Sequence, residues 1–578
     1  MSAEAAAPKT GNATGDPLVG RDSATFLPTV WGDHFLHNNV DDSPQGGLLS
    51  VVMHESEYEV LKEEVKRMVT TDDDGGDDTP QAIANKLRVI DVVQRLGVGY
   101  HFETEIEGEL AKVHALGGEL FAIRDDNNTT PNVDLYHAAL WFRILRQQGF
   151  QVSPDVFRKL KDTRGRFKEW LASDVQVLLS LYEAAHVAVH GEDILDEALD
   201  FATKTLKSIL PELSPSFQKQ VNFSLGLPAW KCVPRTLTRN FIDFYFEDPS
   251  HNNKLLQFAK LDFNMLQKFH QQELREISEW WKGLKVSTKF SHARNRIVEC
   301  YYWICAIYFE PKYRLARMIL TKIISTVSVI DDTYDNFASY EEVEALTEAI
   351  ERMDVGALET LPDTMKDLYH AIIKLYDDIE IELGKRGPTF AVDYAKGELK
   401  KICRAYLAEV HWRAKGYIPT LEEYKLEAYV SGGLPLLCTS TFIGMEPEIA
   451  TREAFEWVTN EPKMVRAVAL IGRFQNDIVS HEFERERKHA ASAIECYMKE
   501  HSTSKEEAIE FLWNEISKGW KDIAEECQKP TPLPVVLTDR VLNFARSISV
   551  IYEKGDGYTD SNLLKAHIAA LFAVPVPL

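Results

Sequence analysis

The pattern of hydrophobic and polar positions predicts helices along nearly the whole chain. Between residues 83 and 210 apolar side chains recur at helical spacing, for example at Leu199, Leu206 and Leu210, before Pro211 ends the run. No alternating pattern of strand length competes with this period. We therefore predict an all-α protein.

The helical period weakens between residues 227 and 253, a stretch that carries three prolines. A chain of 578 residues is also too long for one ordinary core. We predict a mobile N-terminal arm over residues 1–25, an α-helical domain over 26–245 and a second helical domain, a bundle around a central cavity, over 246–578. In the second domain, helices are predicted at 255–281, 294–309, 313–335, 368–383, 391–415, 421–442, 465–484, 505–524, 541–552 and 560–572.

The helix predicted over 313–335 ends in three carboxylates, Asp331, Asp332 and Asp335. Asp331 and Asp335 share one helix face, and an apolar run precedes them. No Lys or Arg occurs between Ile323 and Glu351, so a local salt bridge is unavailable. A hard divalent cation such as Mg2+ would compensate this charge. The alternative is a solvated acidic helix end.

A second set of oxygen side chains lies in the helix predicted over 465–484. Asn476, Ser480 and Glu484 recur at every fourth position and therefore share one face, which indicates a second hard-cation site. Arg473, one turn earlier, suits a phosphate oxygen. The remaining charges fall off this face and are predicted to be solvated: Asp477, Glu482, Arg485 and Glu486.

With these two motifs about 145 residues apart, the chain resembles the plant class I terpene synthases, of the sesquiterpene synthase type, over nearly its full length. The resemblance implies that the two motifs face each other across the cavity and hold three Mg2+ ions, for which Mn2+ can substitute. It also implies that the N-terminal domain is a relict of class II enzymes. Because the chain contains no DxDD motif, we expect that domain to be catalytically silent.

Further matches to the family assign roles around the motifs. Arg294 and Arg296, the first of them 37 residues before Asp331, match an arginine pair that binds the substrate diphosphate together with Arg473 and Asp331. Trp303 stands where the family has a cavity tryptophan. The predicted catalytic residues are Asp331, Asp332, Trp303, Asp556 and Tyr558. Asn295 between the arginines, and Asp22 in the family's N-terminal arginine motif, depart from the usual residues.

Residues that would face the carbocation form a third predicted set, made of Trp303, Tyr552, Ser431, Gly432 and Gly433. The adjacent glycines interrupt the helix predicted over 421–442. Their effect is either to turn carbonyl oxygens toward the cavity or to make a packing kink. Asp556 and Tyr558 would serve either as a late proton relay or as a cap over the site.

Composition excludes several other functions. A formal net charge of −24 and a pI near 5.2 exclude a nucleic-acid-binding protein. The seven cysteines are scattered and contain no CxxC, which favours reduced core thiols over zinc sites or disulfides. His186 and His190, beside Glu192 and Asp193, are interpreted as a helix end and not as a metal cluster.

The sequence also indicates where the protein resides. No apolar run reaches membrane-span length, and the first 20 residues lack signal or transit character. We therefore expect a cytoplasmic protein. We also expect it to be a monomer with no partner beyond its substrate.

The sequence therefore favours a Mg2+-dependent sesquiterpene synthase that ionises farnesyl diphosphate and rearranges the carbocation. Two alternatives remain open. One is a monoterpene synthase acting on geranyl diphosphate, because chain length depends on cavity volume. The other is a helical scaffold that retains the motifs without catalysis.

Overall fold

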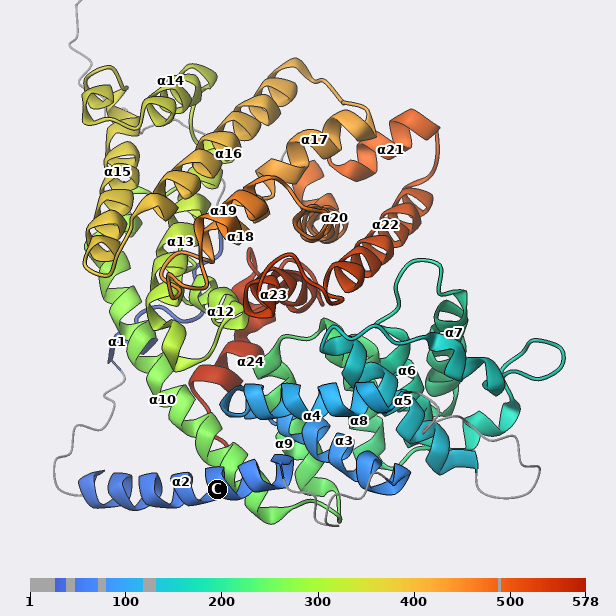
Figure 1. Ribbon diagram of the computed structural model, residues 1–578. Coiled ribbons are helices and arrows are strands. Elements are labelled where there is room, and N and C mark those ends of the chain that lie inside the picture. The colour runs from blue at the N-terminus through green and yellow to red at the C-terminus, as the bar shows by residue number, and fades with distance from the viewer. Residues whose placement is uncertain (1–25, 38–46, 71–78, 118–130, 487–489) are drawn as a thin grey trace, which may run out of the picture.

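The computed structural model describes residues 26–37, 47–70, 79–117, 131–486 and 490–578, without the side chains of 47–55, 131–134, 169 and 483–486. Within these ranges the chain is built from α-helices, short 3-10 helices and loops, and an isolated bridge between Lys161 and Phe167 is the single β-type pairing (Figure 1). The all-α prediction is confirmed.

The helices fall into two groups in Figure 1, one blue to green and one green to red. The N-terminal helices are α1 (His34–His37), α2 (Gly47–Thr70), α3 (Pro80–Arg95), α4 (Glu103–Leu116), α5 (Pro131–Gln147), α6 (Val175–Ala185), α7 (Asp193–Ile209), α8 (Pro215–Gly226) and α9 (Pro234–Glu247). The later helices are α10 (Asn253–Gly283), α11 (Val286–Lys289), α12 (Ile297–Ile307), α13 (Arg314–Asn336), α14 (Tyr340–Arg352), α15 (Asp363–Gly384), α16 (Phe390–Lys415), α17 (Leu421–Ser431), α18 (Leu434–Ser440), α19 (Arg452–Thr459), α20 (Lys463–Glu486), α21 (Ala493–His501), α22 (Lys505–Glu526), α23 (Val535–Ile551) and α24 (Ser561–Phe572).

Helix α10 connects the two groups. It is 31 residues long and begins at the side chain of Asn252, which accepts hydrogen bonds from the backbone N–H groups of Lys254 and Leu255. It packs against α2 and α9 near its N-terminal end and against α1, α12 and α13 nearer its C-terminal end, and α24 contacts it as well (Figure 1). The two helical groups therefore share a continuous apolar core through α10.

A buried ion pair fixes α13 against α10. The Arg317 guanidinium donates from Nε and Nη2 to the two carboxylate oxygens of Glu273, at 2.7 Å each. Both side chains are fully buried, and Arg317 Nη1 also donates to the carbonyl of Tyr308. A bidentate pair of this kind fixes orientation, so α13 carries its C-terminal carboxylates to a set position.

Several helices lie outside the predicted ranges. Helix α9 occupies the stretch where the period weakens, and α14, α19 and α21 are additional. Helix α14 begins with a capping box of Ser339 and Glu342, and Val343, Leu346 and Ile350 follow on one face. The many glutamates between these apolar residues made the helical pattern hard to recognise in the sequence. The range predicted over 421–442 is two helices, α17 and α18. The boundary at residues 245 and 246 stays a prediction.

Candidate active site

Three carboxylates stand in the last two turns of α13. The side chain of Asp332 is buried, that of Asp331 is about one-quarter exposed at 28%, and Asp335 follows one turn later. The carboxyl end of a helix carries partial negative charge, which makes carboxylates there unfavourable without a cation. Arg413 from α16 donates to the carbonyls of Tyr334 and Asp335 and satisfies the helix end.

One arginine from outside α13 reaches two of these carboxylates. Arg294 donates from Nη2 to Asp331 at 2.6 Å, and its backbone N–H and Nε donate to Asp332 at 2.7 and 3.2 Å. Its guanidinium lies between the rings of Phe26 and Tyr558, at 5.3 and 5.0 Å from their centroids. No local salt bridge was predicted for these carboxylates, and the cation that meets them is an arginine 37 residues away in the sequence, which packing brings in.

Burial disfavours the charged forms of these carboxylates. Burial, followed by repulsion from Asp335, raises the pKa of Asp331 to about 7 although Arg294 lowers it. Burial also raises the pKa of Asp332 against the opposing effect of Arg294. A divalent cation would stabilise the charged carboxylates, so the electrostatics of the cluster favour its binding.

The second predicted motif lies on α20, across the same cavity. Asn476 and Ser480 both line it, and the Ser480 hydroxyl donates to the carbonyl of Asn476 at 2.8 Å. The backbone of Glu484 belongs to α20, but its side chain lies outside the described residues, as do those of Arg485 and Glu486. Four-residue spacing on α20 thus places two of the three predicted ligands opposite α13.

Arg473, one turn before Asn476, also lines the cavity. Its Nε donates to Asp477 Oδ1 and to the Tyr424 hydroxyl, at 2.8 Å each. Asp477 is completely buried, and its Oδ2 accepts from the Tyr424 hydroxyl at 2.6 Å and from the backbone N–H of Ala493 at 2.9 Å. The prediction of a solvated Asp477 was wrong, because α17 and α21 cover that face of α20.

Arg296 does not line the cavity with Arg294. It is almost completely buried, and its guanidinium donates to the carbonyls of Leu27, Asn295, Tyr558 and Thr559. These contacts tie residues 27 and 558–559 to the start of α12. In this structure the donors of Arg296 are directed to backbone carbonyls, and its assignment as a diphosphate ligand stays a prediction.

The predicted cation-facing residues lie around the same space. Trp303 of α12 is 6.0 Å from Tyr558 between ring centroids, and the Tyr558 hydroxyl donates to Ser328 on α13 at 2.6 Å. Tyr552, Gly432 and Gly433 line the cavity as well. Asp556 accepts from the backbone N–H groups of Tyr558 and Thr559, at 3.0 Å each. The choice between a proton relay and a cap over the site stays a prediction for Asp556.

The cavity defined by these residues has a volume of about 200 Å³. Sequence reasoning missed several of its lining residues, among them Phe26, Tyr406 and Thr559. Phe26 is the first described residue after the predicted arm, which itself lies outside the described ranges together with Arg21 and Asp22. The helical period of α16 could have indicated a buried Tyr406, but no local pattern marks the other two.

Comparison with known proteins identifies the family. Residues 282–522 match the family model described as terpene synthase family, metal binding domain, and residues 30–225 match that described as terpene synthase, N-terminal domain. A (−)-germacrene D synthase of Vitis vinifera is 45% identical over 568 residues, covering 97% of each chain. The chain belongs to the terpene synthase family. A beta-cubebene synthase of Magnolia grandiflora is 42% identical to this terpene synthase, over 97% of its chain and 98% of the relative.

Solved structures agree with this assignment. Isoprene synthase from grey poplar, in complex with three Mg2+ ions and dimethylallyl-S-thiolodiphosphate, superposes with a TM-score of 0.83 at 32% identity and covers 91% of this terpene synthase and 98% of the poplar chain. A limonene synthase with 2-fluorolinalyl diphosphate gives a TM-score of 0.86 at 27% identity, over 96% and 100% of the two chains. None of the described helices has both the length and the apolar composition needed to cross a bilayer.

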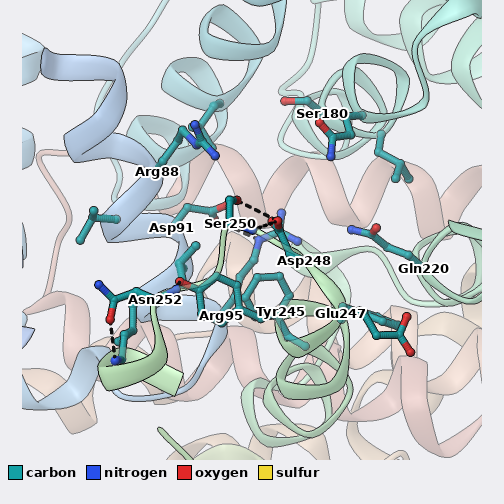
Figure 2. Close-up of a pocket in the computed structure, with 18 of the residues that line it drawn as sticks. Arg88, Asp91, Arg95, Ser180, Gln220, Tyr245, Glu247, Asp248, Ser250 and Asn252 are labelled. Atoms are coloured by element: carbon teal, nitrogen blue, oxygen red, sulfur yellow. Dashed lines mark hydrogen bonds and ion pairs between the residues drawn. The ribbon is translucent and has the colours of Figure 1, made fainter. Parts of the chain in front are cut away.

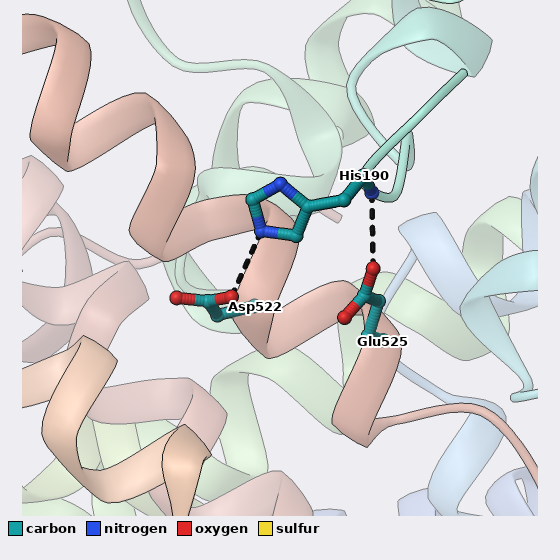
Figure 3. Close-up of side chains that lie close together, drawn as sticks. All are labelled: His190, Asp522 and Glu525. Atoms are coloured by element: carbon teal, nitrogen blue, oxygen red, sulfur yellow. Dashed lines mark hydrogen bonds and ion pairs between the residues drawn. The ribbon is translucent and has the colours of Figure 1, made fainter.

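A second cluster of potential metal ligands lies on the surface of this terpene synthase (Figure 3). His190 donates from its backbone N–H to Glu525 at 3.1 Å, and its Nε2 lies 2.8 Å from Asp522. Lys463 already pairs with both carboxylates, at 2.8 and 2.6 Å. The cluster is therefore an ion-pair contact between the α6–α7 connection and α22. Glu192 instead pairs with Arg146, so the group of two histidines and two acids is not assembled.

Proposed function

We propose that this chain is a Mg2+-dependent sesquiterpene synthase that ionises farnesyl diphosphate, rearranges or cyclises the carbocation and releases diphosphate. The observation that carries the proposal is that oxygen side chains from α13 and α20 line one cavity together with Arg294 and Arg473. Relatives named as germacrene D, cubebene and sesquiterpene synthases favour a C15 substrate over geranyl diphosphate.

The residues present fit Mg2+. Oxygen side chains are its preferred protein ligands, and the charged form of Asp331, whose pKa burial raises, would be stabilised by a cation. The ligands would be Asp331, Asp332, Asp335, Asn476 and Ser480, with Glu484 proposed from the motif. When bound, Mg2+ supplies Lewis-acid stabilisation of the charge that develops on the leaving diphosphate.

The protein itself contributes orientation and exclusion of water. Arg473 is held by Asp477, and Arg294 by Asp331 and Asp332, so both guanidinium groups are positioned before a diphosphate arrives. The ring of Trp303 can stabilise a desolvated carbocation by about 0.5 to 2 kcal/mol. Tyr558 is directed by its hydrogen bond to Ser328 and closes one wall.

The compartment and the oligomeric state belong to the same proposal. All seven cysteines are unpaired, and six of them are buried, which suits a reducing compartment such as the cytosol. We propose a monomer that needs no partner other than its substrate. Light scattering of the purified protein at several concentrations tests this, and a mass twice the 65.8 kDa of one chain would contradict it.

The test of the activity uses the purified full chain with farnesyl or geranyl diphosphate, with Mg2+ or with a chelator. We expect C15 hydrocarbon or alcohol products by gas chromatography and mass spectrometry, with stoichiometric diphosphate release that requires the metal. Faster turnover of geranyl diphosphate would reassign the enzyme to monoterpenes. No product from either substrate would support the scaffold.

A matched pair of variants tests the site. Asp331→Asn should lower kcat/KM about 100-fold or more and raise the Mg2+ concentration needed for half-maximal rate, because a charged ligand is lost. Glu344→Gln removes a similar charge on the exposed face of α14 and should leave both values unchanged. Equal activity of the two variants would contradict the assigned site.

A further inference from the structure

A cavity of about 970 Å³ lies among the N-terminal helices (Figure 2). Its walls come from α2, α3, α5, α6, α8 and α9 and from the start of α10. The described residues that line it are distinct from those of the active-site cavity. Its volume is at the upper end of the range for pockets that bind small organic molecules. We refer to it as the N-terminal cavity.

One wall of the N-terminal cavity is cationic. Arg88, Asp91 and Arg95 follow one another at helical spacing along α3, so they share the face that lines it. Asp91 Oδ1 accepts from Arg95 Nε at 3.0 Å and from Arg143 Nη2 of α5 at 2.7 Å. Two guanidinium groups thus share a single carboxylate oxygen, and Arg88 adds a third cation on the same side (Figure 2).

Some hydrogen-bond donors on this wall have no acceptor among the described residues. Arg143 is 3% exposed, and its Nε has no hydrogen-bond partner. Arg88 is exposed to solvent and forms no ion pair or hydrogen bond with any residue that the structure describes, so its donors are available to a ligand. The buried Nε–H of Arg143 is costly without an acceptor, so this position favours a ligand that supplies acceptor oxygens.

The carboxylates around the N-terminal cavity, by contrast, already have donors. Glu64 pairs with Lys254 at 2.7 Å, and Glu183 accepts from the backbone N–H of Ala229 at 2.8 Å. Asp248 accepts from the backbone and hydroxyl of Ser250, as Figure 2 shows, and Glu247 pairs with Lys219. The described groups of the N-terminal cavity that lack partners are therefore hydrogen-bond donors, so the cavity favours an anion over a cation.

Part of the lining is aromatic, and the Arg95 guanidinium lies 5.6 Å from the Phe241 ring centroid. The rings of Phe217 on α8 and of Phe241, Phe244 and Tyr245 on α9 are half-buried and line the cavity. Gln220 also lines the cavity, and its amide points inward (Figure 2). Half-buried rings gain free energy when a flat apolar group covers them, about 25 cal/mol for each Å² of apolar surface removed from water.

We propose that the N-terminal cavity is a binding site for a small organic anion with a flat apolar body. Its phosphate or carboxylate group is held by Arg88 and Arg143, and its body packs against Phe217, Phe241 and Phe244. This site is separate from the proposed active site and requires no metal, so it gives the N-terminal domain a ligand-binding function of its own.

The test is calorimetric titration of the full chain in a chelator, which keeps divalent ions out of the active site. The probes are 2-naphthyl phosphate, 2-naphthoate and the neutral 2-naphthylmethanol. We expect at least one anion to bind with a stoichiometry of one, and the alcohol at least tenfold more weakly. The better of the two anions identifies the head group as phosphate or carboxylate.

Two variants locate the binding. Arg88→Ala should weaken the anion about tenfold, which corresponds to about 1.4 kcal/mol, whereas Arg164→Ala, which removes an exposed arginine outside the cavity, should have no effect. Phe217→Ala should weaken all three probes, and circular dichroism checks that each variant is folded. The proposal is overturned if neither anion binds at 1 mM, if the alcohol binds equally, or if Arg88→Ala binds like the wild type. Probe binding by a protein that fails to turn over farnesyl diphosphate would still support it.

Discussion

At the scale of single residues, the organisation of the active site depends on which carboxylate holds which arginine. Arg294 is held by two predicted metal ligands, whereas Arg473 is held by Asp477, which lines no part of the cavity. Asp477 also accepts from Tyr424 and from the first turn of α21. It therefore positions Arg473 from behind, and its burial is compatible with charge only because three donors surround it.

Asp477→Asn should lower the free energy of unfolding by about 2 to 4 kcal/mol, because Arg473 then keeps a largely buried charge without its counter-ion. Turnover of farnesyl diphosphate should fall as well, mainly through a higher KM if Arg473 contacts the diphosphate. Denaturant unfolding and steady-state kinetics measure the two effects. Tyr424→Phe, which leaves the ion pair in place, should cost about 1 kcal/mol. Equal costs for the two variants would argue against the ion pair as the main contribution.

At the scale of elements, the break between α17 and α18 shapes one wall of the cavity. Gly433 has φ of +76°, a left-handed conformation that favours glycine. The backbone N–H of Gly432 donates to the carbonyl of Ala428 and that of Gly433 to the carbonyl of Val430, and these bonds close α17. A Cβ at position 433 would meet only the end of Ile402, at 3.6 Å. Backbone conformation, and not crowding, therefore requires glycine there.

Gly433→Ala should lower the free energy of unfolding by about 1 to 2 kcal/mol, because the left-handed conformation is strained for a residue with a Cβ. Gly397→Ala is the matched control: it lies inside α16, a Cβ there meets nothing within 4 Å, and alanine should raise stability by about 0.5 to 1 kcal/mol. Thermal unfolding of both variants tests whether the first substitution lowers stability and the second raises it. A neutral Gly433→Ala would mean that the α17–α18 connection relaxes without cost.

At the scale of the whole molecule, buried and exposed ion pairs contribute differently. Lys521 of α22 pairs with Asp196 of α7 at 2.7 Å and links the two helical groups, but Asp196 is 48% exposed. Arg317 and Glu273, which join α10 to α13, are fully buried. Solvent and salt screen the first pair, while the second has no alternative partner in water.

Lys521→Met should therefore change the free energy of unfolding by less than about 1 kcal/mol. Glu273→Gln should lower it by about 3 to 5 kcal/mol, because Arg317 is left buried with an incomplete partner. Unfolding curves in 0.05 and 1 M salt should give nearly the same stability change for each of these two substitutions. A large loss in Lys521→Met would show that the surface pair, and not the apolar packing along α10, joins the two groups.

The sequence by itself determined the helices and the side chains that share a helix face. Asp331 with Asp335, and Asn476 with Ser480, are related by helical pitch, which is a local property, and the structure places all four around one cavity. The glycine pair likewise predicted the end of α17. Helices whose apolar face is short or interrupted by charge, such as α14 and α21, were missed because their period is weak over so few residues.

Only the tertiary structure decided which residues meet across long separations. It brought Arg294 to Asp331, turned Arg296 away toward backbone carbonyls and buried Asp477 beneath α17 and α21. It also gathered Arg88 and Arg143 around the N-terminal cavity, which no local sequence pattern had indicated. Helical periodicity fixes which face of a helix a side chain occupies, but the neighbour of that face depends on how distant helices pack, and packing is not a local property.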